Sequence, residues 1–482
     1  MQRVETVESD VVQLPLSGAG VLPTITPSAE ASVTMGNRTT LSGFDIPNAG
    51  TSAIEGRNIS TVSIRDNAIA NSTQRGILLT NVTGEVMITD NSIDTTGGIG
   101  NSGFVLENTT ESVDLTIARN RIVNTTNNAI GIGLTNTAEG TANISDNTLS
   151  GNQLNGISVG FDNTAQGTFT INNNTISNSG NIGIAAQTLG NSTSTLTISN
   201  NTVSENGTEG IAAGISGNST STLTINNNTV SGNGEEGIVA EMLGSSTSTL
   251  TIDNNTVSGN GTVGIGIQPQ EFTTSTATIT NNAVSSNGTV GIAAEMLGNS
   301  TSTLTIDNNT VSGNGTAGIA INPDEFATST ATITNNTVSG NGFNAIDTEA
   351  TDGIITTTEG DSSLQLLLEG NSATDNARFG LSIVANDNSQ IFAGVRFNTL
   401  TGNPGSSDPP FPNSFGAQTG SPDNLTTTST ICLDLRNNTS DNGFVLNNNR
   451  PLSTFQADTT ANTGAISIPA LPVEPLGDCP VP

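Results

Sequence analysis

The sequence repeats a unit of 27 residues, Ser221-Thr-Leu-Thr-Ile-Asn-Asn-Asn-Thr-Val-Ser-Gly-Asn-Gly-Glu-Glu-Gly-Ile-Val-Ala-Glu-Met-Leu-Gly-Ser-Ser-Thr247. The isoleucine before the asparagine run marks the period, because it recurs every 27 residues from Ile117 to Ile333. Less regular copies extend the pattern back to Ile64 and forward to Leu435. A fixed period of this length is typical of solenoids, propellers and other repeat arrays.

The residue types within the unit predict strands rather than helices. Apolar and polar residues alternate around Leu223 and Ile225, and again from Ile238 to Met242. Period-two alternation rich in Thr, Val and Ile is typical of β-strands, and glycine and asparagine interrupt the sequence too often for helices. A unit of three short strands cannot bury its apolar face alone, so it must stack on its neighbours. We therefore predict an all-β fold, a single-stranded parallel β-helix of about 14–15 coils, mostly of 27 residues.

An asparagine follows the marker residue by three positions in every coil. Asparagine tolerates the left-handed backbone of a sharp turn, and its amide both donates and accepts, so that stacked copies can bond to one another. The many Asn-Xaa-Thr triplets also permit glycosylation, but the strict register favours a buried ladder. In the regular coils the predicted ladder consists of Asn120, Asn147, Asn174, Asn201, Asn228, Asn255, Asn282, Asn309 and Asn336.

A second motif gives a family resemblance. The pattern Ile-x-x-Asn-x-Val is followed by a Gly-Ile pair, as at Gly210-Ile211 and Gly237-Ile238. Roughly over residues 33–450, this pattern resembles the right-handed parallel β-helix repeats of the pectate-lyase-like superfamily. The resemblance implies a right-handed solenoid. It implies no single activity, because that superfamily includes lyases, hydrolases, phage tailspikes and adhesins.

The unbroken register predicts one solenoid with irregular ends. We expect an N-terminal segment or cap over residues 1–32 and the β-helix over 33–446, with a loop insertion at 404–430. Residues 447–482 are rich in proline, which cannot continue a sheet ladder, so we expect an irregular C-terminal cap there.

The charge of the chain restricts its partners. The sequence has 42 acidic and 11 basic residues, a net charge of −31 at pH 7, and no histidine. Nucleic-acid binding requires a basic surface and is therefore excluded. The acidity favours solubility, or attraction of cations such as calcium; no other cofactor is expected. No apolar run is long enough to form a transmembrane segment.

Two cysteines, Cys432 and Cys479, could form one disulfide near the C-terminal end. A disulfide and an Asn/Thr/Gly-rich composition favour an extracellular or cell-surface location. The first 30 residues lack the pattern of a signal peptide, so we expect either another export route or an incomplete N-terminus.

Catalytic residues implied by the resemblance are absent. The middle coils lack the Arg or Lys base of a uronate lyase, and the chain lacks the histidine of a polygalacturonase-like hydrolase. A polysaccharide-degrading enzyme that uses only two carboxylates stays open, provided that they lie about 5–9.5 Å apart. The candidate carboxylates are Glu241, Glu295, Asp324 and Glu325. Glu241 and Glu295 lie two coils apart, at an expected distance of about 10 Å.

Two further sets of side chains are candidate ligand sites. Asp253 and Asp307 directly follow the marker isoleucine and are either calcium ligands or solvated acids. Threonines that alternate with inward residues should face solvent in columns, which resembles an ice-binding face; threonine is also a favourable strand residue. The predicted threonine face consists of Thr195, Thr197, Thr222, Thr224, Thr249, Thr251, Thr276, Thr278, Thr303 and Thr305.

The sequence as a whole favours a secreted or surface-exposed β-helix without catalytic activity, with a structural or adhesive role. Extracellular polysaccharide or cell-surface components are the expected partners. The alternatives are a carboxylate-pair enzyme and an ice-binding protein.

Overall fold

The computed structural model describes residues 22–94, 102–342, 351–407, 410–411, 413–420, 428–449, 453–468, 473–477 and 480–482. These residues form strands and turns and no helix, so none of them belongs to a helix that could cross a membrane. The chain divides into two compact units, a first unit of residues 1–234 and a second unit of residues 235–482. Each is described by itself.

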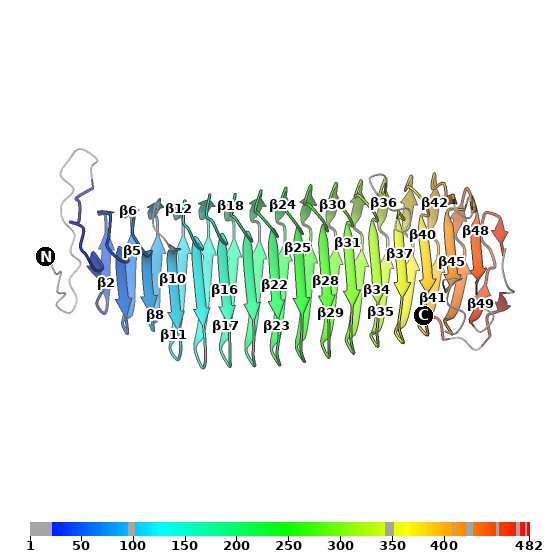
Figure 1. Cartoon of the computed structure of the whole chain (residues 1–482), viewed down its shortest axis with the longest axis horizontal. Coiled ribbons are helices and arrows are strands. Elements are labelled where there is room, and N and C mark those ends of the chain that lie inside the picture. Colours follow the sequence, from blue (N-terminus) through cyan, green and yellow to red (C-terminus); the bar gives the residue numbers. More distant parts are fainter. Residues whose placement is uncertain are drawn as a thin grey trace. The chain divides into compact units, whose positions relative to one another are not determined.

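Within each unit, every complete coil passes in turn through three parallel sheets, which we call sheets B, C and A. In one coil of the second unit the strands are β25 (Ile238–Met242) in sheet B, β26 (Thr247–Asp253) in sheet C and β27 (Thr256–Ser258) in sheet A. Each strand pairs with its counterpart in the next coil, as β26 does with β29 (Thr274–Thr280), residue for residue (Figure 1). The chain is thus an all-β solenoid of about 14 turns with about 27 residues per turn, and the predicted parallel β-helix is confirmed.

The described residues of the first unit form eight strands in each sheet. Sheet B consists of β1 (Val33–Thr34), β4 (Ile54–Arg57), β7 (Arg75–Thr80), β10 (Ser102–Asn108), β13 (Ile130–Leu134), β16 (Ile157–Phe161), β19 (Ile184–Thr188) and β22 (Ile211–Ile215). Sheet C consists of β2 (Thr39–Ser42), β5 (Ser60–Arg65), β8 (Thr83–Thr89), β11 (Ser112–Ala118), β14 (Glu139–Ser145), β17 (Gln166–Asn172), β20 (Thr193–Ser199) and β23 (Thr220–Asn226). Sheet A consists of β3 (Asp45–Pro47), β6 (Ala68–Ala70), β9 (Ser92–Asp94), β12 (Arg121–Val123), β15 (Thr148–Ser150), β18 (Thr175–Ser177), β21 (Thr202–Ser204) and β24 (Thr229–Ser231).

The second unit repeats this order. Sheet B continues from β25 with β28 (Ile265–Pro269), β31 (Ile292–Met296), β34 (Ile319–Pro323), β37 (Ile354–Thr358), β40 (Leu381–Ala385), β45 (Phe415–Thr419), β48 (Phe444–Asn448) and β50 (Ile466–Ser467). Sheet C continues from β26 and β29 with β32 (Thr301–Asp307), β35 (Thr328–Thr334), β38 (Ser363–Glu369), β41 (Gln390–Arg396), β46 (Thr430–Arg436), β49 (Thr454–Asp458) and β51 (Glu474–Pro475). Sheet A continues from β27 with β30 (Ala283–Ser285), β33 (Thr310–Ser312), β36 (Thr337–Ser339), β39 (Ser372–Thr374), β42 (Thr399–Thr401) and β47 (Thr439–Ser440).

Alternation along the strands fills the core. In β26, Leu250 and Ile252 are buried whereas Thr249 is exposed, because successive side chains point to opposite faces of a strand. Register pairs Ile252 with Ile279, so like side chains stack on one another from coil to coil. This stacking explains why the period of the sequence is so strict.

The predicted asparagine ladder is present in both units. Asn174 donates from Nδ2 to Asn201 Oδ1 at 3.0 Å in the first unit, and Asn282 donates in the same way to Asn309 at 3.0 Å in the second. The backbone N–H of Asn282 also donates to Asn309 Oδ1, at 2.9 Å. These side chains are only 1% exposed, as a ladder requires and glycosylation does not allow.

A second buried asparagine ladder lies in the turn between sheet A and the next strand of sheet B. Asn260 donates to Asn287 at 2.9 Å, and Asn287 donates to Asn314 at 3.0 Å. The same arrangement joins Asn206 to Asn233 in the first unit, at 2.8 Å. This second ladder was not predicted from the sequence, although its residues follow those of the first ladder by five positions.

Strands occur in two segments for which the sequence predicted irregular structure. The range 404–430 contains β45, whose Phe415 and Ala417 are buried and fill the core of their coil, together with the short antiparallel pair β43 (Ser406–Ser407) and β44 (Pro410–Phe411). Within 447–482, β49 pairs in parallel with β46, and β50 and β51 pair with β48 and β49. Apolar residues such as Phe455, 1% exposed, explain why these segments still form coils.

Candidate functional site

The BC turn, which joins a strand of sheet B to the following strand of sheet C, differs in sequence from coil to coil in the second unit. From β25–β26 to β40–β41, six successive BC turns have four residues each, and the second residue has a left-handed backbone: Gly244, Glu271, Gly298, Glu325, Gly360 and Asp387. This conformation is free of strain for glycine and unfavourable for other residues, by about 1–2 kcal/mol. Glu271 offsets part of this cost, because its Oε2 accepts a hydrogen bond of 2.6 Å from the backbone N–H of Gly244 in the preceding turn.

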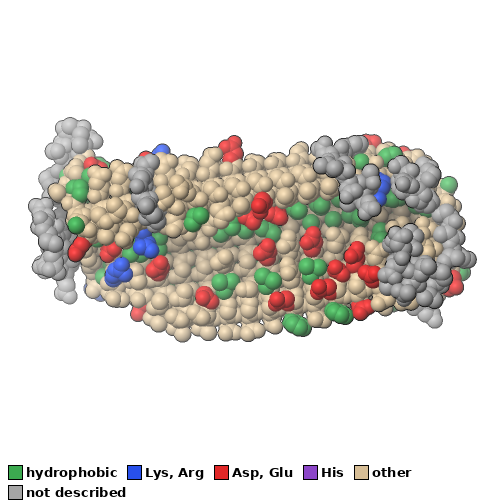
Figure 2. Space-filling view, viewed as in Figure 1, with side chains coloured by type: hydrophobic (Ala, Val, Ile, Leu, Met, Phe, Trp, Pro, Cys, Tyr) green, Lys and Arg blue, Asp and Glu red, His purple; other side chains and the backbone are tan. Residues whose placement is uncertain are grey.

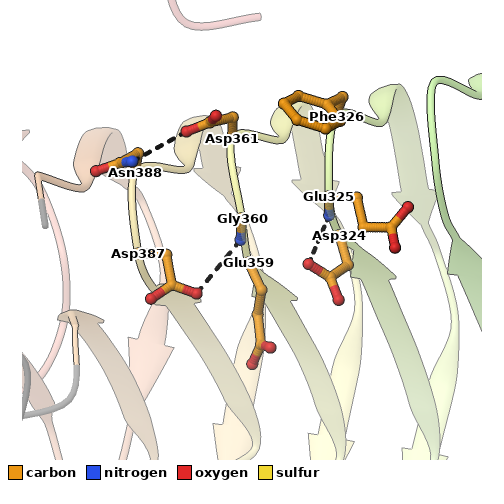
Figure 3. A pocket seen from close by; sticks show the side chains of 8 residues that line it. All are labelled: Asp324, Glu325, Phe326, Glu359, Gly360, Asp361, Asp387 and Asn388. Atoms are coloured by element: carbon orange, nitrogen blue, oxygen red, sulfur yellow. Dashed lines mark hydrogen bonds between the residues drawn. The ribbon is translucent and has the colours of Figure 1, made fainter.

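Three consecutive BC turns enclose an open groove of about 700 Å³. Figure 3 shows Phe326, Asp361 and Asn388 in line along one rim, with the other labelled residues below them in the view. The groove is lined by Asp324, Glu325, Phe326, Glu359, Gly360, Asp361, Asp387 and Asn388. Five of these eight residues are acidic.

Hydrogen bonds between neighbouring coils fix parts of the groove. Asn388 Nδ2 donates to Asp361 Oδ1 at 3.0 Å, and the backbone N–H of Gly360 donates to Asp387 Oδ2 at 3.4 Å (Figure 3). Asn386 Nδ2 donates to Glu359 Oε1 at 3.3 Å. Among the described residues, no arginine lies within 4.0 Å of the five carboxylates, since the ion pairs of the second unit are formed elsewhere. The groove therefore carries an uncompensated negative charge.

Two phenylalanine rings project from BC turns of the second unit. Phe326 is 59% exposed on the rim of the groove, and Phe272 is 66% exposed at the same turn position two coils earlier. Neither ring was among the candidate ligand sites predicted from the sequence. The signal was present, because Gln268-Pro-Gln-Glu-Phe272 recurs as Asn322-Pro-Asp-Glu-Phe326.

The candidate catalytic carboxylates fall into two places. Glu241 and Glu295 are exposed on the outer face of sheet B, where their partners in register are the amides Gln268 and Asn322. Neither of these register partners is a carboxylate. Asp324 and Glu325 lie in the groove.

Asp253 and Asp307 make the same contacts with the following coil. Asp253 Oδ1 accepts hydrogen bonds from Thr280 Oγ1 at 2.8 Å and Asn281 Nδ2 at 2.7 Å. Asp307 Oδ1 accepts from Thr334 Oγ1 and Asn335 Nδ2, at 2.6 and 2.9 Å. These contacts stabilise the turn after sheet C. Within the described part of the second unit alone, no three acidic side chains bring their oxygens within 4.8 Å of one another, as a calcium site would require.

The predicted threonine face follows the outer side of sheet C. In the second unit Thr249, Thr276 and Thr303 are exposed and in register, and Thr251, Thr278 and Thr305 beside them are half-buried. In the first unit Thr195 and Thr222 are exposed and paired, with Thr197 and Thr224 half-buried. Each unit thus presents columns of threonine.

Comparison with protein families identifies the fold. Residues 25–167, 158–248 and 245–361 match the family described as "Right handed beta helix region". The chain belongs to the right-handed β-helix family. The resemblance inferred from the repeat is confirmed, and with it the hand of the solenoid.

Solved structures similar to this right-handed β-helix include two epimerase modules from Azotobacter vinelandii. The A-module of mannuronan C-5 epimerase AlgE4 is 14% identical, with 86% of this chain and 91% of that chain covered and a TM-score of 0.40. The A-module of mannuronan C-5 epimerase AlgE6 is 15% identical, with 82% and 90% covered and a TM-score of 0.37. No curated protein sequence matches the chain. Likeness at this level carries no argument about activity.

Arginines of the right-handed β-helix form hydrogen-bonded ion pairs with aspartates in both units. In the second unit, burial of Asp434 opposes its ionisation, but hydrogen bonds from Arg436 and Arg396 outweigh burial and lower the pKa of this carboxyl. In the first unit, Arg119 donates two hydrogen bonds of 2.7 Å to Asp90 and lowers the pKa of that carboxyl. These pairs are structural, because none of their residues lines the groove.

Only one of the two cysteines predicted to form a disulfide lies within the described residues. Cys432 is buried in β46 and is disulfide-bonded. Cys479, its expected partner, lies outside the described residues.

Proposed function

We propose that this β-helix is a secreted or cell-surface protein that binds polysaccharide along the BC turns of its second unit and does not cleave it. The observation that carries the proposal is the groove of three successive BC turns, with an exposed ring at Phe326 and carboxylates along its length. Apolar ring faces and carboxylate oxygens are the two kinds of group that contact the C–H faces and hydroxyls of sugars.

The repeat supports a binding role. Binding to a polymer requires a surface that recurs along the direction of the polymer, and a solenoid supplies this by stacking similar turns. The disulfide-bonded Cys432 supports an oxidising, extracellular environment.

Chain cleavage is disfavoured by the position of the carboxylates. A hydrolase needs one carboxylic acid and one carboxylate on opposite sides of the scissile bond, about 5–9.5 Å apart. The carboxylates of the groove lie instead along open turns of successive coils.

Size-exclusion chromatography with light scattering tests the proposal on mixtures of the protein with soluble extracellular polysaccharides. We expect co-elution with at least one polymer whose mass is unchanged. A fall in polymer mass would show catalysis, and absence of co-elution with every polymer would refute binding.

Calcium is proposed only to assist binding of the polysaccharide, because the carboxylate oxygens of the groove are ligands that calcium prefers. The same mixtures are run with calcium and with a chelator. Equal co-elution in both would remove calcium from the proposal.

The threonine columns favour a second candidate, ice binding. Thr249, Thr276 and Thr303 present hydroxyl and methyl groups at a regular spacing of about 4.8 Å on the outer side of sheet C. Thermal hysteresis and ice recrystallisation measure this activity, and absence of both at high protein concentration would remove the candidate.

A further inference from the structure

The two exposed rings on the BC turns of the second unit occupy equivalent places in the solenoid. Phe272 and Phe326 are each the third residue of a BC turn, after a proline that ends the sheet-B strand and a glutamate with a left-handed backbone. The turn between them has Gly298 and the exposed Asn299 at the corresponding positions. Rings and small polar side chains therefore alternate along this edge.

The spacing of the rings follows from the fold. Neighbouring parallel strands lie about 4.8 Å apart, so equivalent atoms two coils apart are separated by about 10 Å. Two sugar units of an extended β-linked chain cover a similar length. A chain lying along this edge could stack alternate sugars on Phe272 and Phe326 and pass the sugar between them over Asn299.

The charge of the same edge restricts the kind of sugar. Beyond Phe326 the edge continues into Glu359, Asp361 and Asp387, and the described residues place no cation beside them. Figure 2 shows acidic and hydrophobic side chains next to each other on this face of the second unit. Such a surface repels uronate polymers, whereas a protonated amine is attracted both to the carboxylates and to the face of an aromatic ring.

We infer that the BC-turn edge of the second unit binds a β-linked polymer of amine-bearing sugars, with Phe272 and Phe326 stacking on alternate sugars. This inference rests on the proposed polysaccharide-binding function and names its ligand class. The amines bind the carboxylates of the groove, and the rings set the register of the polymer.

Pull-down on insoluble polymers tests the inference, with partly deacetylated chitin, fully acetylated chitin, cellulose and cross-linked pectate as probes. The wild-type protein should bind partly deacetylated chitin most tightly and pectate least. Replacing both rings, Phe272→Ala with Phe326→Ala, should weaken binding to partly deacetylated chitin about tenfold. Phe397→Ala is the matched control, because Phe397 is also 57% exposed but lies after sheet C, away from the edge.

Two double variants distinguish binding at a local site from binding that depends only on the net charge of the protein. Glu359→Gln with Asp361→Asn removes two charges from the groove, and Glu241→Gln with Glu295→Gln removes two exposed charges from sheet B. We expect weaker binding only for the first pair, with unchanged urea midpoints for both. Equal weakening by both pairs would overturn the inference.

The outcomes distinguish the inference from the function on which it rests. Binding to cellulose or pectate without preference for partly deacetylated chitin would refute the inference and leave the function standing. Binding to none of the polymers would refute both. Binding that the ring variants leave unchanged would overturn the assignment to this edge.

Discussion

A single ladder asparagine uses every polar atom of its side chain. Asn282 Nδ2 donates to Asn309 Oδ1, to the carbonyl of Ile252 at 2.9 Å and to that of Thr280 at 2.8 Å. Its Oδ1 accepts from both the backbone N–H and the Nδ2 of Asn255, at 2.8 and 3.0 Å. Neither aspartate nor serine could replace this pattern, because the first lacks a donor and the second is too short.

Replacing this side chain should therefore destabilise the second unit. We expect Asn282→Ala to lower the free energy of unfolding by about 3 kcal/mol, because it leaves buried groups of the preceding coil without partners. Asn299→Ala, at an exposed turn position, should change it by less than about 0.5 kcal/mol. Urea denaturation measures both. Similar small effects for the two variants would contradict the structural role of the ladder.

At the scale of the element, the BC turn allows a reciprocal test of backbone strain. An added Cβ at Gly298, where φ is +67°, would lie 2.8 Å from the backbone N of Glu271. We expect Gly298→Ala to destabilise the second unit by about 2 kcal/mol. Glu325, at the equivalent place, has φ of 58°, so Glu325→Gly should stabilise by about 1 kcal/mol.

Urea denaturation measures the free energy of unfolding of each variant. Stabilisation by Glu325→Gly would show that this glutamate is kept for a reason other than folding. A loss of stability would instead mean that its side chain makes contacts that outweigh the strain.

The elements differ in how far the sequence predicts them. The strands and the first ladder were predicted because inward Leu250 and Ile252 and the asparagine position recur without interruption. β45 was missed because the turn before it lengthens its coil and hides the period. The groove could not be derived from the repeat, since it is formed by Asp324, Glu359 and Asp387, which belong to coils of different sequence and length.

At the scale of the whole molecule, the net charge of −31 sets how stability depends on pH. The sequence pI is about 4.1, so lowering the pH from 7 toward this value reduces the repulsion between carboxylates in the folded state. Asp90 and Asp434 act in the opposite direction. Their pKa values are held below the ordinary 3.8, so they stabilise the fold above that pH, and the stabilisation is lost as the pH falls further.

The two effects operate in different ranges of pH, so we expect a maximum of stability in acid. Because the chain has no histidine, the melting temperature should change little from pH 7 to about pH 5.5 and should rise from there toward the pI of about 4.1 as repulsion decreases. It should fall below pH 3.8 as the paired carboxylates of Asp90 and Asp434 are protonated. Sodium chloride at pH 7 should also raise the melting temperature, because it screens the same repulsion. Scanning calorimetry at several pH values and salt concentrations measures both trends. A melting temperature that falls steadily from about pH 5.5 toward the pI of about 4.1 and does not respond to salt would show that repulsion between the unpaired acids has little effect on this fold.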